Sequence, residues 1–380
     1  MAVEVQGMCD ERFNAVRATL AASLERGDDV GASVAVTVAG ELVVDLWGGW
    51  ADEARTEPWG RDTITNVWST TKTMTALCAL MVADAGELDL NAPVARYWPE
   101  FAAAGKADRV LVRHLLGHTA GLAGWSQPIT VYDLYDWEKC TSLLAAQEPW
   151  WEPGSASGYH AITQGYLVGE VIRRVTGRSL GTFFREEVAG PLGADFHIGL
   201  DPADFPRVAN VIPPPPISIP DEAHLPEMAL RTLMNPFMDV AAVWSEDWRR
   251  AEIPAAGGHG NARSVATIQA ILANGGTLAG RRFLSGAGVE RVLEEQANGR
   301  DLVLGVPIRF GMGYGLPSPL MPINATGRAC YWGGYGGSVI VVDLERRATF
   351  AYMMNKMGDG LVGDTRGLSL GMAVMAGLAS

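Results

Sequence analysis

The sequence predicts an α+β fold in which both chain ends contribute to one antiparallel sheet and a long, mostly helical segment lies between them. Segments with strand-like apolar patterns cluster near the two ends of the chain, and their connections are short enough for hairpins. The region between them has helical periodicity instead. Strands and helices do not alternate as a parallel, doubly wound sheet requires, which favours the antiparallel arrangement.

The first part of the chain predicts one helix and one hairpin. Residues 10–26 place their apolar side chains on a single helical face. Residues 32–39 and 41–47 are strand-like segments on either side of Gly40, so a tight turn is expected between them. The helix is expected to cover the sheet that this hairpin begins.

The middle of the chain is predicted to be mostly helical. The segments with the clearest helical pattern are residues 70–85, 109–117, 160–176, 179–189 and 264–274. Four prolines at 213–216 and a fifth at Pro220 predict a stiff, extended loop that crosses this region.

The last part of the chain predicts three strands and a closing helix. The strands are residues 329–332, 338–343 and 348–354, and the helix is residues 368–378. We therefore expect a discontinuous sheet domain, residues 1–66 and 280–380, and a mainly helical domain, residues 67–279. The active site is expected between the two domains.

The composition indicates which kinds of partner and which cellular compartment are expected. A formal charge of −13 makes nucleic acid and an anionic membrane surface unfavourable partners. No apolar run reaches the roughly 18 residues of a spanning helix, and the N-terminus lacks a signal-peptide pattern. We therefore expect a cytoplasmic protein with reduced thiols. The four cysteines lack metal-ligand spacing and no cofactor fingerprint is present, so neither a metal nor an organic cofactor is expected. The oligomeric state is left open.

The most informative short motif is Ser69-Thr-Thr-Lys72, the only Ser-x-x-Lys sequence in a chain with four lysines. Its two polar side chains stand one helical turn apart, where a hydroxyl and an amine can form a nucleophile and its base. The motif opens an almost wholly apolar helical run that ends at Gly86. We expect this helix to be buried and its N-terminus to favour developing negative charge.

A simpler interpretation of this motif is a serine N-cap followed by a solvated lysine. Ser69 suits that role, but Lys72 does not, because a cation in the first turn opposes the helix dipole. Burial and the like charge of the helix terminus would both lower the pKa of Lys72 from its ordinary value of about 10.4.

Two further segments are candidates for the same site. Tyr159 ends a Pro/Gly/Ser loop, which suits the second group of a proton shuttle, although such a tyrosine also serves as an ordinary packing residue. If Tyr159 lies near Lys72, the two groups titrate as a coupled pair, and the sequence leaves open which of them holds the proton. Residues 331–338 form the densest glycine cluster, which indicates either a strand edge that lines the site or a glycine bulge.

Together these stretches resemble the serine β-lactamase and penicillin-binding-protein superfamily, and most closely its class-C-like carboxylesterases, the family VIII esterases. The resemblance extends over residues 10–378. The matching segments are Ser69–Lys72, residues 86–99, Leu115–Leu122, Pro153–Tyr159, Asn261–Ser264 and Leu272–Gly276. The resemblance implies a β-lactamase-like fold and a serine hydrolase without a metal or an organic cofactor.

Two positions depart from the β-lactamase pattern. The third position of the family's Tyr-x-Asn motif is Ala161, and its Lys-Thr-Gly strand becomes Trp332-Gly333-Gly334. In β-lactamases the missing lysine helps to bind the substrate carboxylate, whereas Trp332 offers an apolar wall. The resemblance therefore implies small, neutral carboxylic esters as substrates.

The resemblance also implies a role for each matching residue. Ser69 would attack the ester carbonyl, and Lys72 and Tyr159 would take up its proton and return it. The backbone N–H groups of Ser69 and Tyr335 would hold the oxyanion. The expected substrate-binding residues are Trp332, Gly333, Gly334, Trp125 and Trp150.

Several alternatives use the same residues. The acyl-serine could pass to an alcohol or amine in an acyltransferase, an amide or D-peptide could be cleaved, and weak β-lactamase activity stays open. A penicillin-type sensor would acylate without turnover. His114 and His118 are spaced like a zinc-binding pair on a helix, but the neighbouring glycines mark a helix end and the resemblance gives this segment a structural role.

Overall fold

Both chain ends build the main sheet. The computed structural model describes residues 4–214, 226–319, 321–323 and 326–380. Its six-stranded sheet has the order β1-β3-β2-β14-β13-β12, and all neighbouring strands are antiparallel. The strands are β1 (Gln6–Cys9), β2 (Gly31–Val38), β3 (Glu41–Gly49), β12 (Ala329–Gly333), β13 (Val339–Asp343) and β14 (Ala348–Met354). The predicted α+β class is confirmed, and the two chain ends meet where Ala35 of β2 pairs with Ala351 of β14.

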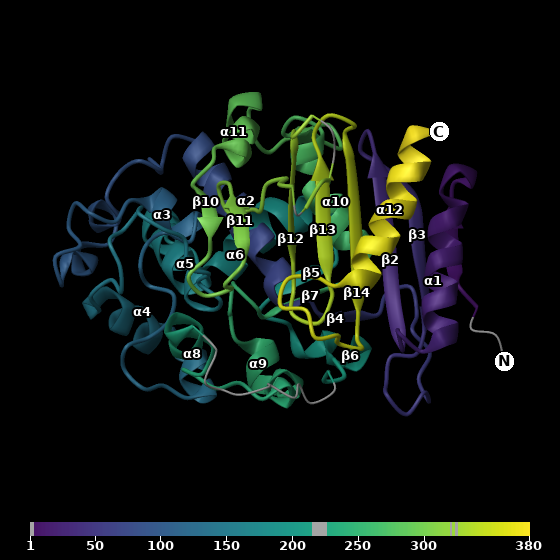
Figure 1. Ribbon diagram of the computed structural model, residues 1–380, viewed down its shortest axis with the longest axis horizontal. Coiled ribbons are helices and arrows are strands. Elements are labelled where there is room, and N and C mark those ends of the chain that lie inside the picture. The colour runs from purple at the N-terminus through teal and green to yellow at the C-terminus, as the bar shows by residue number, and fades with distance from the viewer. Residues whose placement is uncertain (1–3, 215–225, 320, 324–325) are drawn as a thin grey trace.

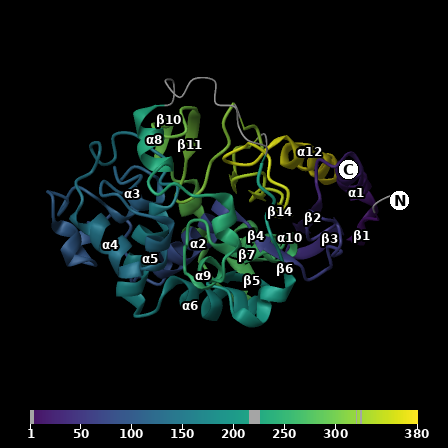
Figure 2. The ribbon, with the colours of Figure 1, turned by 90° about the horizontal axis from the view of Figure 1, so that it is seen from below.

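Helices cover both faces of this sheet. Helices α1 (Asn14–Arg26) and α12 (Thr365–Ala379) pack together on one face, as the terminal helices were expected to do. Helix α10 (Ala262–Ala273) lies on the opposite face, against β2 and β14 (Figure 2). The expected boundary at residue 279 assigns α10 to the helical domain, whereas its apolar face is buried against the sheet.

The remaining helices form the region beside the sheet (Figure 1). They are α2 (Thr71–Asp84), α3 (Val112–Leu116), α4 (Trp137–Ala146), α5 (Thr163–Thr176), α6 (Leu180–Phe184), α7 (Gly190–Leu192), α8 (Glu227–Leu233), α9 (Glu246–Arg250) and α11 (Gly286–Glu290). The predicted helices at 109–117 and 160–176 begin three residues later than expected, at α3 and α5. The predicted helix at 179–189 is α6, which continues as a π-helix over Arg185–Ala189. Within the described residues every helix is too short or too polar to cross a membrane.

Short strands complete the fold, and the sequence pattern predicted none of them. A four-stranded sheet has the order β5-β7-β4-β6, and two further pairs are hairpins. These strands are β4 (Ile64–Asn66), β5 (Phe196–Ile198), β6 (Val208–Ala209), β7 (Gly258–Gly260), β8 (Thr277–Leu278), β9 (Arg281–Arg282), β10 (Ala297–Arg300) and β11 (Pro307–Phe310). Strands of two to four residues show no period that could reveal them. The predicted proline loop lies largely outside the described residues, since 215–225 are among those not described.

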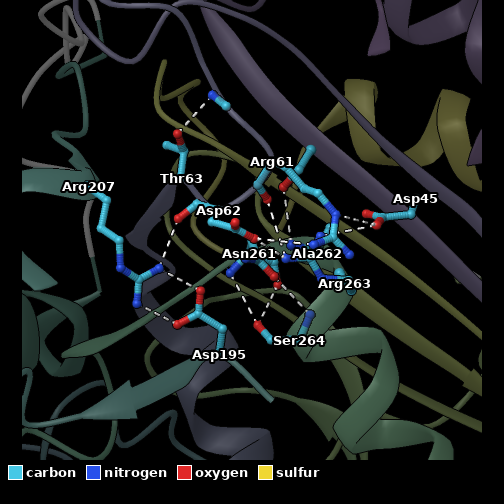
Figure 3. Close-up of polar contacts among 12 residues, drawn as sticks. Asp45, Arg61, Asp62, Thr63, Asp195, Arg207, Asn261, Ala262, Arg263 and Ser264 are labelled. Carbon is cyan, nitrogen blue, oxygen red and sulfur yellow. Dashed lines mark hydrogen bonds and ion pairs between the residues drawn. The ribbon is translucent and has the colours of Figure 1, made fainter. Parts of the chain in front are cut away.

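An ionic network joins α10 to the loop before β4 (Figure 3). Arg263, in the first turn of α10, donates to Asp45 of β3 at 3.1 Å and to Asp62 at 2.7 Å. Arg207 donates to the main-chain carbonyl of Asp62 at 2.9 Å and to both carboxylate oxygens of Asp195, at 2.6 and 2.8 Å. The network ties the large sheet to the small one and holds β4, the strand that leads to Ser69.

Candidate active site

Ser69 lies in a sharp turn between β4 and α2. The turn is a 3₁₀ segment over Trp68–Thr70, and Trp68 has a φ of 49°. Such a left-handed backbone is costly for a residue with a large side chain, so the surroundings must hold it. The Thr71 hydroxyl donates to the Trp68 carbonyl at 2.6 Å, and the Trp68 N–H donates to Asn66 Oδ1 at 3.3 Å. This geometry places the Ser69 side chain at the entrance to a helix that is buried along most of its length.

Lys72 is buried, with 1% of its surface exposed, and its amine faces the serine. Nζ lies 3.1 Å from Ser69 Oγ and donates to the main-chain carbonyls of Ala161 at 2.7 Å and Ala255 at 2.9 Å. Burial lowers the pKa of Lys72 well below its ordinary value. A neutral amine has two N–H groups for the two carbonyls and a lone pair that accepts the Ser69 hydroxyl proton. Ala161 replaces the asparagine of the Tyr-x-Asn motif, yet its main-chain carbonyl still contacts the lysine.

Tyr159 completes a three-residue contact. Its Oη donates to Ser69 Oγ at 2.7 Å and accepts the indole N–H of Trp332 at 3.3 Å. Burial raises the pKa of the phenol above its ordinary value, and the charge of Asp301 acts in the same direction. The sequence left open whether Lys72 or Tyr159 holds the proton. The pKa values of the two groups move in opposite directions, which favours a protonated phenol and a neutral amine.

The end of β12 lies against the Ser69 turn. A Cβ at Gly334 would collide with the Val67 carbonyl and the Ser338 hydroxyl, so only glycine allows this approach. The Tyr335 ring meets the Trp68 ring edge-on, with the centroids 5.6 Å apart. The N–H groups of Ser69 and Tyr335 have no hydrogen-bond partner among the described residues. Both donors are therefore available to a substrate oxygen.

The three tryptophans predicted to line the pocket divide between two apolar clusters. The site cluster comprises Ala123, Tyr159, Val303, Phe310 and Trp332, with Trp150 packed against it. Trp332 does more than form an apolar wall, because its indole N–H reaches the phenol oxygen. Trp125 lies in the main core instead, where its ring packs against Tyr166 and its N–H donates to the Cys140 carbonyl at 3.1 Å. The geometry thus does not bring Trp125 together with the other predicted pocket residues.

The structure also places groups that the sequence did not single out. The carbonyl of Ala255 holds Lys72, and the carboxylate of Asp301 accepts the Tyr159 N–H at 3.0 Å. A main-chain acceptor has no sequence signal, and Asp301 is 142 positions from Tyr159. His118 accepts the His160 N–H through Nδ1 at 3.1 Å. Burial lowers the pKa of His118 well below its usual value, so this ring is a neutral structural group.

Comparison with known proteins defines the class of this chain. It belongs to the beta-lactamase family, whose model matches residues 16–370. It is 38% identical to the esterase/beta-lactamase LipL of Mycobacterium tuberculosis, over 94% of this chain and 84% of that protein. The crystal structure of a family VIII carboxylesterase matches with a TM-score of 0.92 and 42% identity, covering 98% of this chain and all of the other. A penicillin-binding-protein homologue from Caulobacter crescentus matches with a TM-score of 0.92 and 39% identity, again over 98% of this chain and 100% of the other.

Proposed function

We propose that this protein is a serine hydrolase that cleaves small carboxylic esters through an acyl-serine intermediate. The observation that carries the proposal is the contact of Ser69 Oγ with both Lys72 Nζ, at 3.1 Å, and Tyr159 Oη, at 2.7 Å. A hydroxyl between a neutral amine and a protonated phenol is an activated nucleophile with a proton donor beside it. Similarity to proteins that are themselves named esterases supports the choice of reaction.

In the acylation step, Ser69 Oγ attacks the ester carbonyl carbon while its proton moves to Lys72 Nζ. The N–H groups of Ser69 and Tyr335 hold the oxyanion of the tetrahedral intermediate, and one such donor is typically worth ~10²–10³ in rate. The bond to the alcohol oxygen then breaks, and Tyr159 gives this oxygen its proton. The proton held by Lys72 restores the phenol.

In the deacylation step, water takes the place of the alcohol. Its proton moves to Lys72 Nζ, which is neutral again after restoring the phenol, and its oxygen attacks the acyl carbon. The bond to Ser69 Oγ breaks, the acid leaves, and the serine recovers its proton. In each proton transfer the donor or acceptor is a buried group, and burial has shifted its pKa toward the protonation state that the step needs.

Trp332 favours esters over β-lactams in this scheme. By the resemblance it replaces the lysine that meets the substrate carboxylate in a β-lactamase, and its indole N–H donates to Tyr159 Oη, so no cation is offered at this position. Hydrolysis of β-lactams is a second candidate activity, because LipL, at 38% identity, is named an esterase/beta-lactamase. The ratio of nitrocefin turnover to ester turnover separates the two activities.

The test is a panel of p-nitrophenyl esters of increasing acyl length with intact-mass detection of the adduct. The wild type is expected to turn over a short ester and to carry an acyl group on Ser69. Ser69→Ala is expected to fold and to lose this hydrolysis, because among the described residues no other hydroxyl contacts both the amine and the phenol. Activity of more than a few per cent in Ser69→Ala would remove Ser69 as the nucleophile. Product analysis with added alcohol distinguishes hydrolysis from acyl transfer.

A further inference from the structure

Asp301 begins the loop that joins β10 to β11, and 1% of its surface is exposed. Its Oδ1 accepts three main-chain N–H groups. Those of Val303 and Leu304, both at 2.9 Å, belong to the same loop and make an ordinary turn cap. The third belongs to Tyr159, at 3.0 Å, and comes from a segment 142 positions away in the chain. A local turn does not require this third bond.

The main chain on both sides of Tyr159 is held as well. The Gly158 N–H donates to the carbonyl of His118 at 3.0 Å, and the His160 N–H donates to the ring of His118 at 3.1 Å. The Leu302 N–H, next to Asp301, donates to the Ser157 carbonyl at 2.9 Å. Three consecutive N–H groups are therefore bonded, and the middle one, at Tyr159, is held by Asp301.

The second carboxylate oxygen of Asp301 accepts none of these hydrogen bonds. Oδ2 is buried and has no hydrogen-bond partner among the described residues. A buried unsatisfied oxygen is rare and calls for an explanation. Every bond that the carboxylate makes within the described chain comes from a main-chain N–H, so no side-chain cation neutralises its charge through a hydrogen bond. This charge acts on the phenol of Tyr159 and favours its protonated form.

We propose that Asp301 is the positioning residue of Tyr159. Through its bond to the Tyr159 N–H it anchors the main chain, so that the phenol at the far end of the side chain stays on Ser69 Oγ. The proposal rests on the proposed ester hydrolysis. Because a displacement of about 1 Å can cost ~10²-fold in rate, loss of this anchor is expected to reduce turnover without abolishing it.

The test compares Asp301→Ala and Asp301→Asn with the control Asp343→Ala. Asp343 is also buried, at 3% exposure, and its Oδ1 caps the turn after β13 through the N–H groups of Glu345 and Arg346. The three measurements are kcat and KM with a short p-nitrophenyl ester, urea unfolding, and deuterium exchange of peptides that contain Tyr159. The last of these does not depend on catalysis.

Asp301→Ala is expected to lower kcat by about 10- to 100-fold, with KM changed by less than about threefold. The Tyr159 N–H should exchange faster in this variant. Asp301→Asn retains a neutral acceptor and should lie between the wild type and Asp301→Ala. Asp343→Ala should lose stability and keep its kcat and its Tyr159 exchange.

Wild-type kcat in folded Asp301→Ala would overturn the proposal, even with faster exchange, because the anchor would then be structural only. If Asp301→Ala does not fold, Asp301→Asn decides: an unchanged kcat overturns the proposal, and a lowered kcat with faster exchange supports it. Failure of the wild type to cleave any ester would refute the proposed function instead. The exchange measurement would still report whether Asp301 holds Tyr159.

Discussion

Lys72 and Lys106 are two buried lysines that have different hydrogen-bond partners. Lys106 Nζ donates to three main-chain carbonyls, whereas Lys72 Nζ donates to two and also faces the hydroxyl of Ser69. Burial lowers the pKa of both amines, that of Lys106 to about 8. Three carbonyls satisfy an ammonium group, whereas two carbonyls and a hydroxyl suit a neutral amine. The third partner, a hydroxyl at Lys72 and a carbonyl at Lys106, thus distinguishes a candidate base from a structural lysine among buried amines.

This difference predicts opposite outcomes for the same substitution. Lys72→Met is expected to lower kcat for a short ester by at least ~10³-fold, the upper range for losing a general base, while the protein stays folded. Lys106→Met is the matched control: it removes three buried hydrogen bonds and should lower the urea midpoint while kcat per folded molecule is retained. Steady-state kinetics and urea titration of both variants check this. Equal loss of kcat in the two variants would contradict the assignment of Lys72 as the base.

At the scale of elements, the site lies where the end of β12 contacts the start of α2. At Gly334 the contact is made by the main chain. Gly334 lets the strand end approach the Val67 carbonyl, and the Ser338 hydroxyl donates to the same carbonyl at 2.8 Å. The approach leaves the N–H groups of Ser69 and Tyr335 free among the described residues. The proposed oxyanion donors therefore depend on backbone spacing between two elements far apart in the sequence.

A methyl group at this contact is expected to separate the two elements. Gly334→Ala should lower kcat by ~10-fold or more, since the Tyr335 N–H moves away from the oxyanion position. Gly286→Ala is the control, because a Cβ at Gly286, at the start of α11, meets no atom within 4 Å. That variant should have the wild-type kcat, and its urea midpoint should be equal to or higher than that of the wild type. Full activity in Gly334→Ala would show that the donor spacing does not depend on this contact.

At the scale of the whole molecule, several histidines are buried in neutral form. Burial lowers the pKa of His114 and of His160 to about 4, and that of His259 to about 3. In the unfolded chain these groups have a pKa of about 6.5. Between that value and about pH 4 the unfolded state binds protons that the folded state does not, so stability falls as the pH falls.

The free energy of unfolding is accordingly expected to decrease between pH 7.5 and pH 5. For one histidine, a shift of the pKa from 6.5 to about 4 on folding lowers the free energy of unfolding by ~2 kcal/mol at pH 5. Urea titrations across this range measure the summed effect of these groups. His114→Gln keeps an acceptor for the Leu111 N–H, which Nδ1 accepts at 3.2 Å, and removes one titrating group. This variant should show a shallower dependence on pH. A free energy of unfolding that stays constant from pH 7.5 to 5 would contradict the neutral burial of these rings.

The main strands and the long helices were predictable because each carries its own periodic signal. Strands β2 and β3 have strand-like patterns of apolar residues on either side of a glycine turn, and α2 is apolar on all sides. The small sheet that contains β4 and β7 was missed because its strands are two or three residues long. The packing of α10 on the main sheet was missed because periodicity identifies a buried face but not the element that buries it.

The pairing of Ser69 with Lys72 follows from the chain alone, because residues three apart share a helix face wherever that helix lies. The third partner does not follow in this way: Tyr159 is 90 positions from Ser69, and Asp301 is 142 from Tyr159, so only packing brings them into contact. Protonation states also depend on packing, since removal of water from around an amine and a phenol moves their pKa values in opposite directions. Local spacing thus specifies which groups are available for chemistry, and burial in the folded chain specifies which of them carries the proton.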